Sequence, residues 1–140
     1  MEQNPILVID DDADDLDLIK EVANYLKLTN PLLLFKSGKE LITYFETSTT
    51  VPFLILCDVN LPGETGFDIK KNISDDPELR YKAVPFIFWS TSASEKQIQQ
   101  AYDLPAQGFF FKPNNFNDLC ETFKTILGYW QKSQHPKRLS

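Results

Sequence analysis

Charged and hydroxyl side chains stand at the points where short apolar runs of this sequence end. Asp10 and Asp11 follow the first run, and Asp58 follows the third. Ser90 follows the fourth run, and Lys112 follows the fifth. Clustered carboxylates repel one another unless a cation neutralises them, and oxygen ligands without His or Cys favour a hard ion such as Mg²⁺. A carboxylate beside that ion can attack phosphorus and form an aspartyl phosphate, while the metal and a lysine neutralise the developing charge.

The apolar runs themselves predict the strands that carry these groups. The five runs are residues 6–9, 32–35, 53–57, 86–89 and 109–111. Most of them are continuously apolar, which is typical of strands buried on both faces. Prolines precede or open several of the runs, as expected where a strand begins.

Helical patterns separate the predicted strands. Apolar residues recur at helical spacing over 14–28, 38–47, 66–74, 95–103 and from 115 or 117 to about 130. Ser37, Thr65 and Ser94 are the expected N-caps of the second, third and fourth helices. Regular alternation of strand and helix predicts an α/β fold with a doubly wound parallel sheet. We expect the flavodoxin-like (βα)5 arrangement with strand order 2-1-3-4-5, which gathers the polar strand ends at one edge.

Composition and charge limit the remaining classes of function. The chain has 140 residues, 20 acidic against 14 basic, and a net charge of −6, which disfavours nucleic-acid binding. No apolar stretch approaches a membrane span, and the N-terminus does not resemble a signal peptide. The distant Cys57 and Cys120 suggest free thiols and a cytoplasmic protein, and the single His135 makes a His-based metal site improbable.

The acidic residues are concentrated near the N-terminus, where positions 10–17 hold six of the 20. Asp10 and Asp11 belong to the expected metal site at the strand end. The others, Asp12, Asp14, Asp15 and Asp17, are expected to start the first helix and to be solvated, because acids favour a helix N-terminus.

Taken in order, these motifs resemble the receiver domain of two-component response regulators. The resemblance rests on residues 6–11, on 58–63 with Gly66, on 89–91 and on 109–113. It covers about residues 5–130, which we expect to form one receiver domain, followed by a short polar tail, 131–140, and no output domain. Ser-Thr-Ser after the fourth strand and residues 76–80 are further similar to small stand-alone receivers, including those partnered with bacterial phytochromes.

The resemblance implies a role for each matching position in the acidic pocket. Asp58 matches the phosphoacceptor. Asp10 and Asp11 match the acidic pair, and Asp11 is the member of the pair expected to coordinate Mg²⁺ directly. Asn60 matches the residue whose backbone carbonyl binds Mg²⁺ and whose side chain lies near the water that attacks during dephosphorylation. Lys112 matches the conserved-type lysine of the family.

Other matching positions are those that the family uses to respond to phosphorylation, and residues next to them. Ser90 matches the hydroxyl that moves to the phosphate, and Phe109 matches the aromatic switch position, although a Phe there can also be a core residue. Thr91 occupies a position that is often alanine. Lys112–Pro113 matches a peptide bond that is commonly cis in receivers, and an X–Pro bond makes that isomer accessible.

The implied function is a phosphorylation-controlled signalling module rather than a conventional enzyme, one that promotes its own aspartyl phosphorylation and dephosphorylation. The expected partners are a sensor histidine kinase or histidine phosphotransfer protein and a downstream protein, with no nucleic acid and no membrane. The expected output face is formed by the fourth helix, fifth strand and fifth helix next to Phe109. Tyr129 and Trp130 either pack on the core or serve a dimer interface, so a homodimer stays open.

Three other classes compete with this interpretation. Acids at 10, 12, 14 and 21 match an EF-hand loop, but Asp15 stands where that loop needs Gly. A haloacid-dehalogenase-type phosphatase would use Asp10-Asp11-Asp12, Ser90 and Lys112. Against this class, no acidic pair follows Lys112, no cap segment fits in 140 residues, and Asp58 would have no role. A flavodoxin-like flavin binder needs a Ser/Thr/Gly-rich phosphate loop where this chain is acidic.

Overall fold

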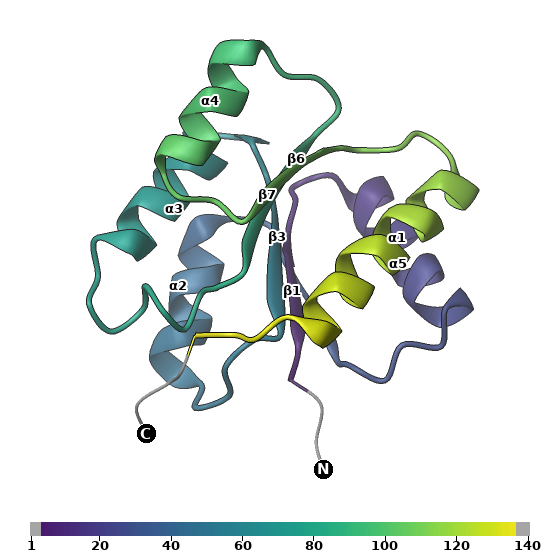
Figure 1. The fold of residues 1–140 in the computed structure, drawn as a ribbon, viewed down its shortest axis with the longest axis horizontal. Coiled ribbons are helices and arrows are strands. Elements are labelled where there is room, and N and C mark those ends of the chain that lie inside the picture. The colour runs from purple at the N-terminus through teal and green to yellow at the C-terminus, as the bar shows by residue number, and fades with distance from the viewer. Residues whose placement is uncertain (1–3, 137–140) are drawn as a thin grey trace.

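A five-stranded parallel sheet forms the centre of the protein (Figure 1). The computed structural model describes residues 4–136. The strands of the sheet are β1 (Ile6–Ile9), β2 (Leu32–Phe35), β3 (Leu54–Asp58), β6 (Phe86–Ser90) and β7 (Gly108–Phe111). Their order is β2-β1-β3-β6-β7, and every neighbouring pair is parallel. This confirms the predicted flavodoxin-like order 2-1-3-4-5 of the five main strands.

Helices cover both faces of the sheet. They are α1 (Ala13–Tyr25), α2 (Gly38–Thr47), α3 (Gly66–Ser74), α4 (Glu95–Asp103) and α5 (Phe116–Lys132). Figure 1 shows α1 and α5 on one side of the sheet and α2, α3 and α4 on the other. The doubly wound arrangement predicted from the alternation of strands and helices is therefore present.

Alternate side chains of each central strand enter two separate cores. In β1, Ile6 and Val8 pack toward α1 and α5, while Leu7 and Ile9 pack toward α2 and α3. Successive side chains of a strand point to opposite faces, so a strand covered by helices on both faces has to be apolar at every position. All four residues of β1 are accordingly buried, whereas the edge strand β2 is only half-buried.

Side-chain caps set the helix starts where the sequence predicts them. Ser37 Oγ accepts from the Glu40 amide, and Thr65 and Ser94 each form a capping box with the residue three positions on. Asn115 caps α5, which decides between the two predicted starts of that helix. Each cap satisfies an amide that has no partner within its helix.

The structure differs from the predicted elements at two places. The first helix ends at Tyr25 rather than near residue 28, because Lys27 adopts a left-handed backbone conformation with φ of 54° and its amide bonds back to Asn24. A small hairpin that we did not predict, β4 (Asn60–Leu61) and β5 (Glu64–Thr65), follows β3. Gly63 makes its turn possible with φ of +77°.

The lengths and the hydropathy of the helices show whether any of them could span a membrane. Within residues 4–136, no helix combines the length and the hydropathy needed to cross a bilayer.

Burial of one lysine predicts a pH dependence of stability. Lys70 on α3 is 2% exposed, its Nζ lies 5.3 Å from the centroid of the Phe86 ring, and burial lowers its pKa from 10.5. Between the lowered pKa and 10.5, the unfolded chain binds a proton that the folded chain has lost. The contribution of Lys70 to the free energy of unfolding therefore rises with pH in that window.

Urea unfolding of wild type and Lys70→Met from about pH 7 up to pH 10.5, the upper end of that window, measures this contribution. We expect the stability of Lys70→Met relative to wild type to fall as the pH rises. Lys96→Met, which removes an exposed lysine from α4, is the control and should show no such trend. Parallel pH profiles for Lys70→Met and wild type would contradict the prediction.

The close approach of α3 to the end of β3 requires glycine at position 66. A Cβ added to Gly66 would collide with the main-chain oxygen of Asp58 and lie 3.2 Å from Cys57 Sγ. We expect Gly66→Ala to lower the free energy of unfolding by about 1–3 kcal/mol, as overpacked cores do. Gly128→Ala in α5, where a Cβ meets nothing within 4 Å, is expected to raise it by about 0.5–1 kcal/mol. Thermal unfolding of both variants tests these two predictions. Equal shifts of the melting temperature in Gly66→Ala and Gly128→Ala would refute them.

Candidate functional site

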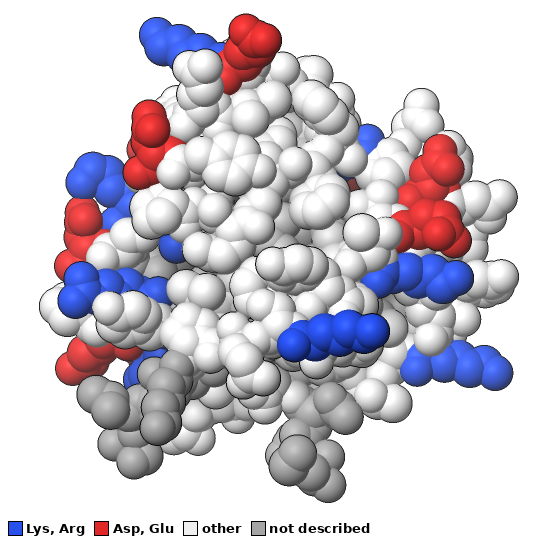
Figure 2. Space-filling view, in the orientation of Figure 1, with Lys and Arg blue, Asp and Glu red and all other residues white. Residues whose placement is uncertain are grey.

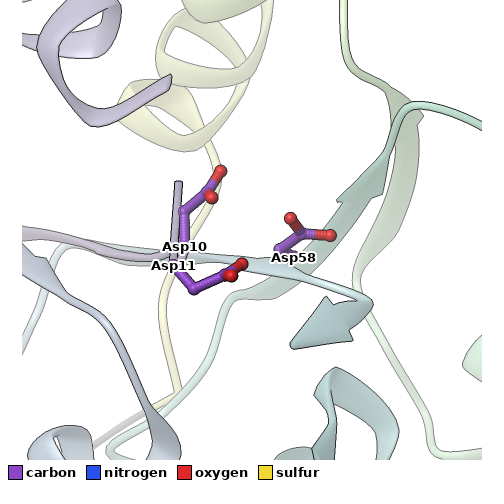
Figure 3. A group of neighbouring side chains, drawn as sticks. All are labelled: Asp10, Asp11 and Asp58. Atoms are coloured by element: carbon purple, nitrogen blue, oxygen red, sulfur yellow. The ribbon is translucent and has the colours of Figure 1, made fainter. Parts of the chain in front are cut away.

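Three carboxylates meet where β1 and β3 end, as the sequence predicts (Figure 3). Asp10 and Asp11 directly follow β1, and Asp58 is the last residue of β3. One carboxylate oxygen from each of the three lies within 4.8 Å of those of the other two. Because β1 and β3 are parallel and in register from Ile6 and Leu54 onward, their carboxyl ends deliver these side chains to the same edge of the sheet.

Lys112 joins the two strand ends electrostatically. Its Nζ donates to Asp10 Oδ2 and to Asp58 Oδ2, each at 2.7 Å. The lysine side chain is 8% exposed, and the carboxylates of Asp10 and Asp58 are 0% and 10% exposed. The backbone amide of Lys112 donates to the Ser90 carbonyl at 2.7 Å, so the residue following β7 is also held to β6.

Burial and ion pairing shift the pKa values of Asp10 and Lys112. Burial raises the pKa of Asp10 to about 6, against the hydrogen bonds from Lys112 and from the Asp12 amide. Burial alone would lower the pKa of Lys112, but its hydrogen bonds to carboxylates hold that pKa above the ordinary value. The lysine is therefore charged throughout the physiological range, and it is the cation that the buried acids face.

Asn60 and Ser90 border Asp58 on the side of β6. The Asn60 amide donates to Asp58 Oδ1 at 3.0 Å, and Asn60 Nδ2 donates to Ser90 Oγ at 3.2 Å. Ser90 Oγ in turn donates to the Ser92 carbonyl at 2.8 Å. The structure thus brings both residues to the pocket, with the serine hydroxyl bound to its own loop.

The remaining predicted residues lie partly beside this centre and partly away from it. Thr91 is exposed directly after β6, and Gly66 is buried against Asp58 where α3 begins. Phe109 is half-buried on β7, with its ring centroid 6.4 Å from that of Phe88 and 6.2 Å from that of Phe111. Trp130 packs partly against the core, whereas its neighbour Tyr129 is 64% exposed.

The expected isomer of the Lys112–Pro113 bond was wrong. Among the described residues, Val84–Pro85 is the one cis peptide bond, so Lys112–Pro113 is trans. The two isomers of an X–Pro bond differ little in energy, and the trans form already places Lys112 Nζ against Asp10 and Asp58.

Asp15 joins the site although its position predicts a solvated helix start. Its Oδ2 lies 3.0 Å from Lys112 Nζ, and its side chain is 39% exposed. An acid in the first turn of a helix is ordinarily explained by the helix dipole, and here Asp12 already caps α1. Contact with a lysine 97 residues away has no signature in the local pattern.

The oxygen donors of the pocket fit a hard divalent cation. Asp10, Asp11 and Asp58 offer three carboxylates and no nitrogen or sulfur ligand, which is the set that Mg²⁺ prefers. An EF-hand loop is not formed, because Asp14 and Glu21 lie within α1. The tail residue His135 lies away from the pocket, with Nε2 2.6 Å from the Phe53 carbonyl.

Two proteins of known name match nearly the whole chain. Response regulator Rcp1 of Synechocystis sp. is 27% identical over 137 residues, and the match covers 92% of each protein. The probable methanogenesis regulatory protein FilR2 of Methanothrix harundinacea is 27% identical over 129 residues, covering 89% of this chain and 82% of that protein.

Solved structures also match nearly the whole chain, and they match its fold. The phosphorylated cyanobacterial phytochrome response regulator RcpA superimposes with a TM-score of 0.84 at 27% identity, covering 96% of this chain and 99% of RcpA. The Mn²⁺-bound form of Rcp1 gives a TM-score of 0.80 at 26% identity, with the same coverage of the two chains. The predicted similarity to receivers of phytochrome systems is thereby confirmed.

The family model of the response regulator receiver domain matches residues 6–124, which include all the pocket residues described above. With the acidic pocket, the lysine and the strand order in agreement, this chain belongs to the response regulator receiver domain family of two-component signalling.

Proposed function

We propose that this receiver accepts a phosphoryl group on Asp58 from the phosphohistidine of a sensor histidine kinase or a histidine phosphotransfer protein. The phosphorus–nitrogen bond to the imidazole breaks, a phosphorus–oxygen bond to the Asp58 carboxylate forms, and the imidazole is released. The observation that carries the proposal is the pairing of Asp58 with Lys112 at 2.7 Å inside a group of three carboxylates. The similarity to phosphorylated RcpA supports it.

Asp10, Asp11 and Asp58, together with the backbone carbonyl of Asn60, are the proposed Mg²⁺ ligands. The ion supplies charge neutralisation for the transferring phosphoryl group. The Mn²⁺-bound structure of Rcp1 supports a divalent cation in a related protein. This chain contributes the oxygen donors, and it keeps Asp10 buried beside Lys112 so that one carboxylate is already oriented.

The other pocket residues have proposed roles beside Asp58 and the phosphoryl group. Lys112 neutralises negative charge beside Asp58, and Gly66 leaves room for the Asp58 backbone. Ser90 donates its hydroxyl to the phosphoryl group, and Thr91 lies at the rim of the pocket. The proposed bounds of the receiver domain are 5–130, and its proposed location is the cytoplasm.

Incubation with Mg²⁺ and acetyl phosphate tests the proposal. Intact-mass measurement is expected to show one added phosphate on the wild type and none on Asp58→Asn, because the amide cannot accept the phosphoryl group. Removal of the cation with EDTA should also prevent labelling. Undiminished labelling of Asp58→Asn would overturn the assignment of the acceptor.

The proposed signalling surface is formed by α4, β7 and α5. A groove of about 350 Å³ lies here, and its rim includes Tyr102, Phe109 and Tyr129. Figure 2 shows that this face is largely uncharged over β7 in the orientation of Figure 1, with most charged side chains toward the outline and a basic side chain across its lower middle. Exposed apolar surface next to an unpaired strand edge is typical of a protein–protein contact. We propose that a second copy of the chain binds here when Asp58 is phosphorylated.

Sedimentation velocity with and without acetyl phosphate measures this association. Phosphorylated wild type is expected to form a dimer, and Tyr102→Ser is expected to weaken it by about tenfold or more, the usual effect of truncating a buried interface aromatic. Tyr81→Ser is the matched control, since Tyr81 is 55% exposed and Tyr102 is 54% exposed. A sedimentation coefficient unchanged by phosphorylation would argue against the dimer.

A further inference from the structure

The ammonium of Lys112 is bound by three carboxylates, and the roles proposed above account for two of them. Asp10 and Asp58 each lie 2.7 Å from Nζ, and Asp15 lies 3.0 Å from it. An ammonium group has three N–H donors. The third donor is therefore engaged by a residue of α1, an element that contributes none of the residues proposed to bind Mg²⁺ or phosphate.

Asp15 approaches the lysine from a different environment than the other two acids. Its side chain is 39% exposed, whereas those of Asp10 and Asp58 are 0% and 10% exposed. The ring of Trp89 borders the same ammonium, with its centroid 5.6 Å from Nζ. Asp15, Trp89 and Lys112 line a cavity of only about 20 Å³, which is no larger than one or two waters need. The ammonium therefore has little freedom to move within its pocket.

Phosphorylation modifies one of the three acceptors and leaves the other two chemically unchanged. When Asp58 becomes an acyl phosphate, its negative charge moves outward onto the phosphoryl oxygens. If the bonds to Asp10 and Asp15 are kept, the N–H that pointed to Asp58 is free to meet one of those oxygens. Two fixed bonds orient the third donor of an ammonium, which lowers the reorganisation needed during the transfer.

We propose that Asp15 is a positioning residue for Lys112: it holds the ammonium in the orientation that meets the transferring phosphoryl group. This inference rests on the proposed phosphorylation of Asp58. It requires the specific bond at 3.0 Å and not merely one more negative charge at the start of α1. Asp14 provides the comparison, because it carries the same charge in the same helical turn but is exposed and has no ion pair among the described residues.

Phosphorylation kinetics of Asp15→Asn and Asp14→Asn separate the effect of the bond to Lys112 from the effect of a negative charge at the start of α1. The donor is acetyl phosphate, at saturating Mg²⁺. Asp15→Asn is expected to lower the maximal rate of phosphorylation by about fivefold, within the range of a partly exposed ion pair. The acetyl phosphate concentration at half-maximal rate should change by less than about twofold. Asp14→Asn should leave both quantities close to wild type, and Asp15→Glu should restore most of the rate because its carboxylate can still reach Nζ.

Tryptophan emission gives a second measurement that needs no phosphodonor. In a Trp130→Phe background, Trp89 is the remaining tryptophan, and its emission depends on the position of the charge 5.6 Å away. Asp15→Asn is expected to shift that emission, while Asp14→Asn is not.

Equal rates and equal spectra for Asp15→Asn and Asp14→Asn would overturn the inference, as would a faster reaction in Asp15→Asn. Failure of the phosphoacceptor proposal is distinguishable from either result, since wild type itself would then acquire no label that depends on Asp58.

Discussion

The hydrogen-bonded ion cluster around Lys112 is the interaction on which the site depends. Carboxylates at the ends of buried strands are costly to desolvate, and removal of one partner from a buried ion pair leaves an uncompensated charge. Asp10 is fully buried, and burial raises its pKa to about 6 even beside the lysine. The ammonium of Lys112, 2.7 Å from both Asp10 and Asp58, is what permits two acids to occupy neighbouring strand ends. A divalent cation held by these carboxylates and by the exposed Asp11 would add to the same neutralisation.

The parallel sheet makes this cluster geometrically possible. The strands β1, β3, β6 and β7 are adjacent and all point the same way, so residues far apart in the chain arrive at one edge. Lys112 and Asp10, 102 positions apart, are in contact because each comes directly after its strand. The backbone bond from Lys112 to the Ser90 carbonyl then fixes where the lysine side chain begins.

Sequence patterns predicted the elements of this protein better than its individual contacts. Strand and helix positions follow from apolar runs, and helix starts follow from capping residues such as Ser94, because both depend on neighbours within a few residues. The position of the site was predicted from the strand order, because the carboxyl ends of parallel strands lie at the same edge of the sheet. Asp15 was assigned to solvent because its bond to Lys112 joins residues 97 positions apart, and no local pattern reports such a contact. The short hairpin after Asp58 was also missed, although Gly63 at its turn was a local signal that could have indicated it.

The hydrogen bonds of Ser90 indicate how chemistry at Asp58 reaches the rest of the molecule in the proposed function. A hydroxyl has one proton to donate, and in this structure it is donated to the Ser92 carbonyl in the loop before α4. Donation to a phosphoryl oxygen therefore requires that this bond be broken, which frees the loop between β6 and α4. On the same strand, Phe88 pairs in register with Phe109 and contacts its ring, so β6 borders both the pocket and the groove beside α4. The competition for a single proton thus connects the state of Asp58 to the face that we propose for association.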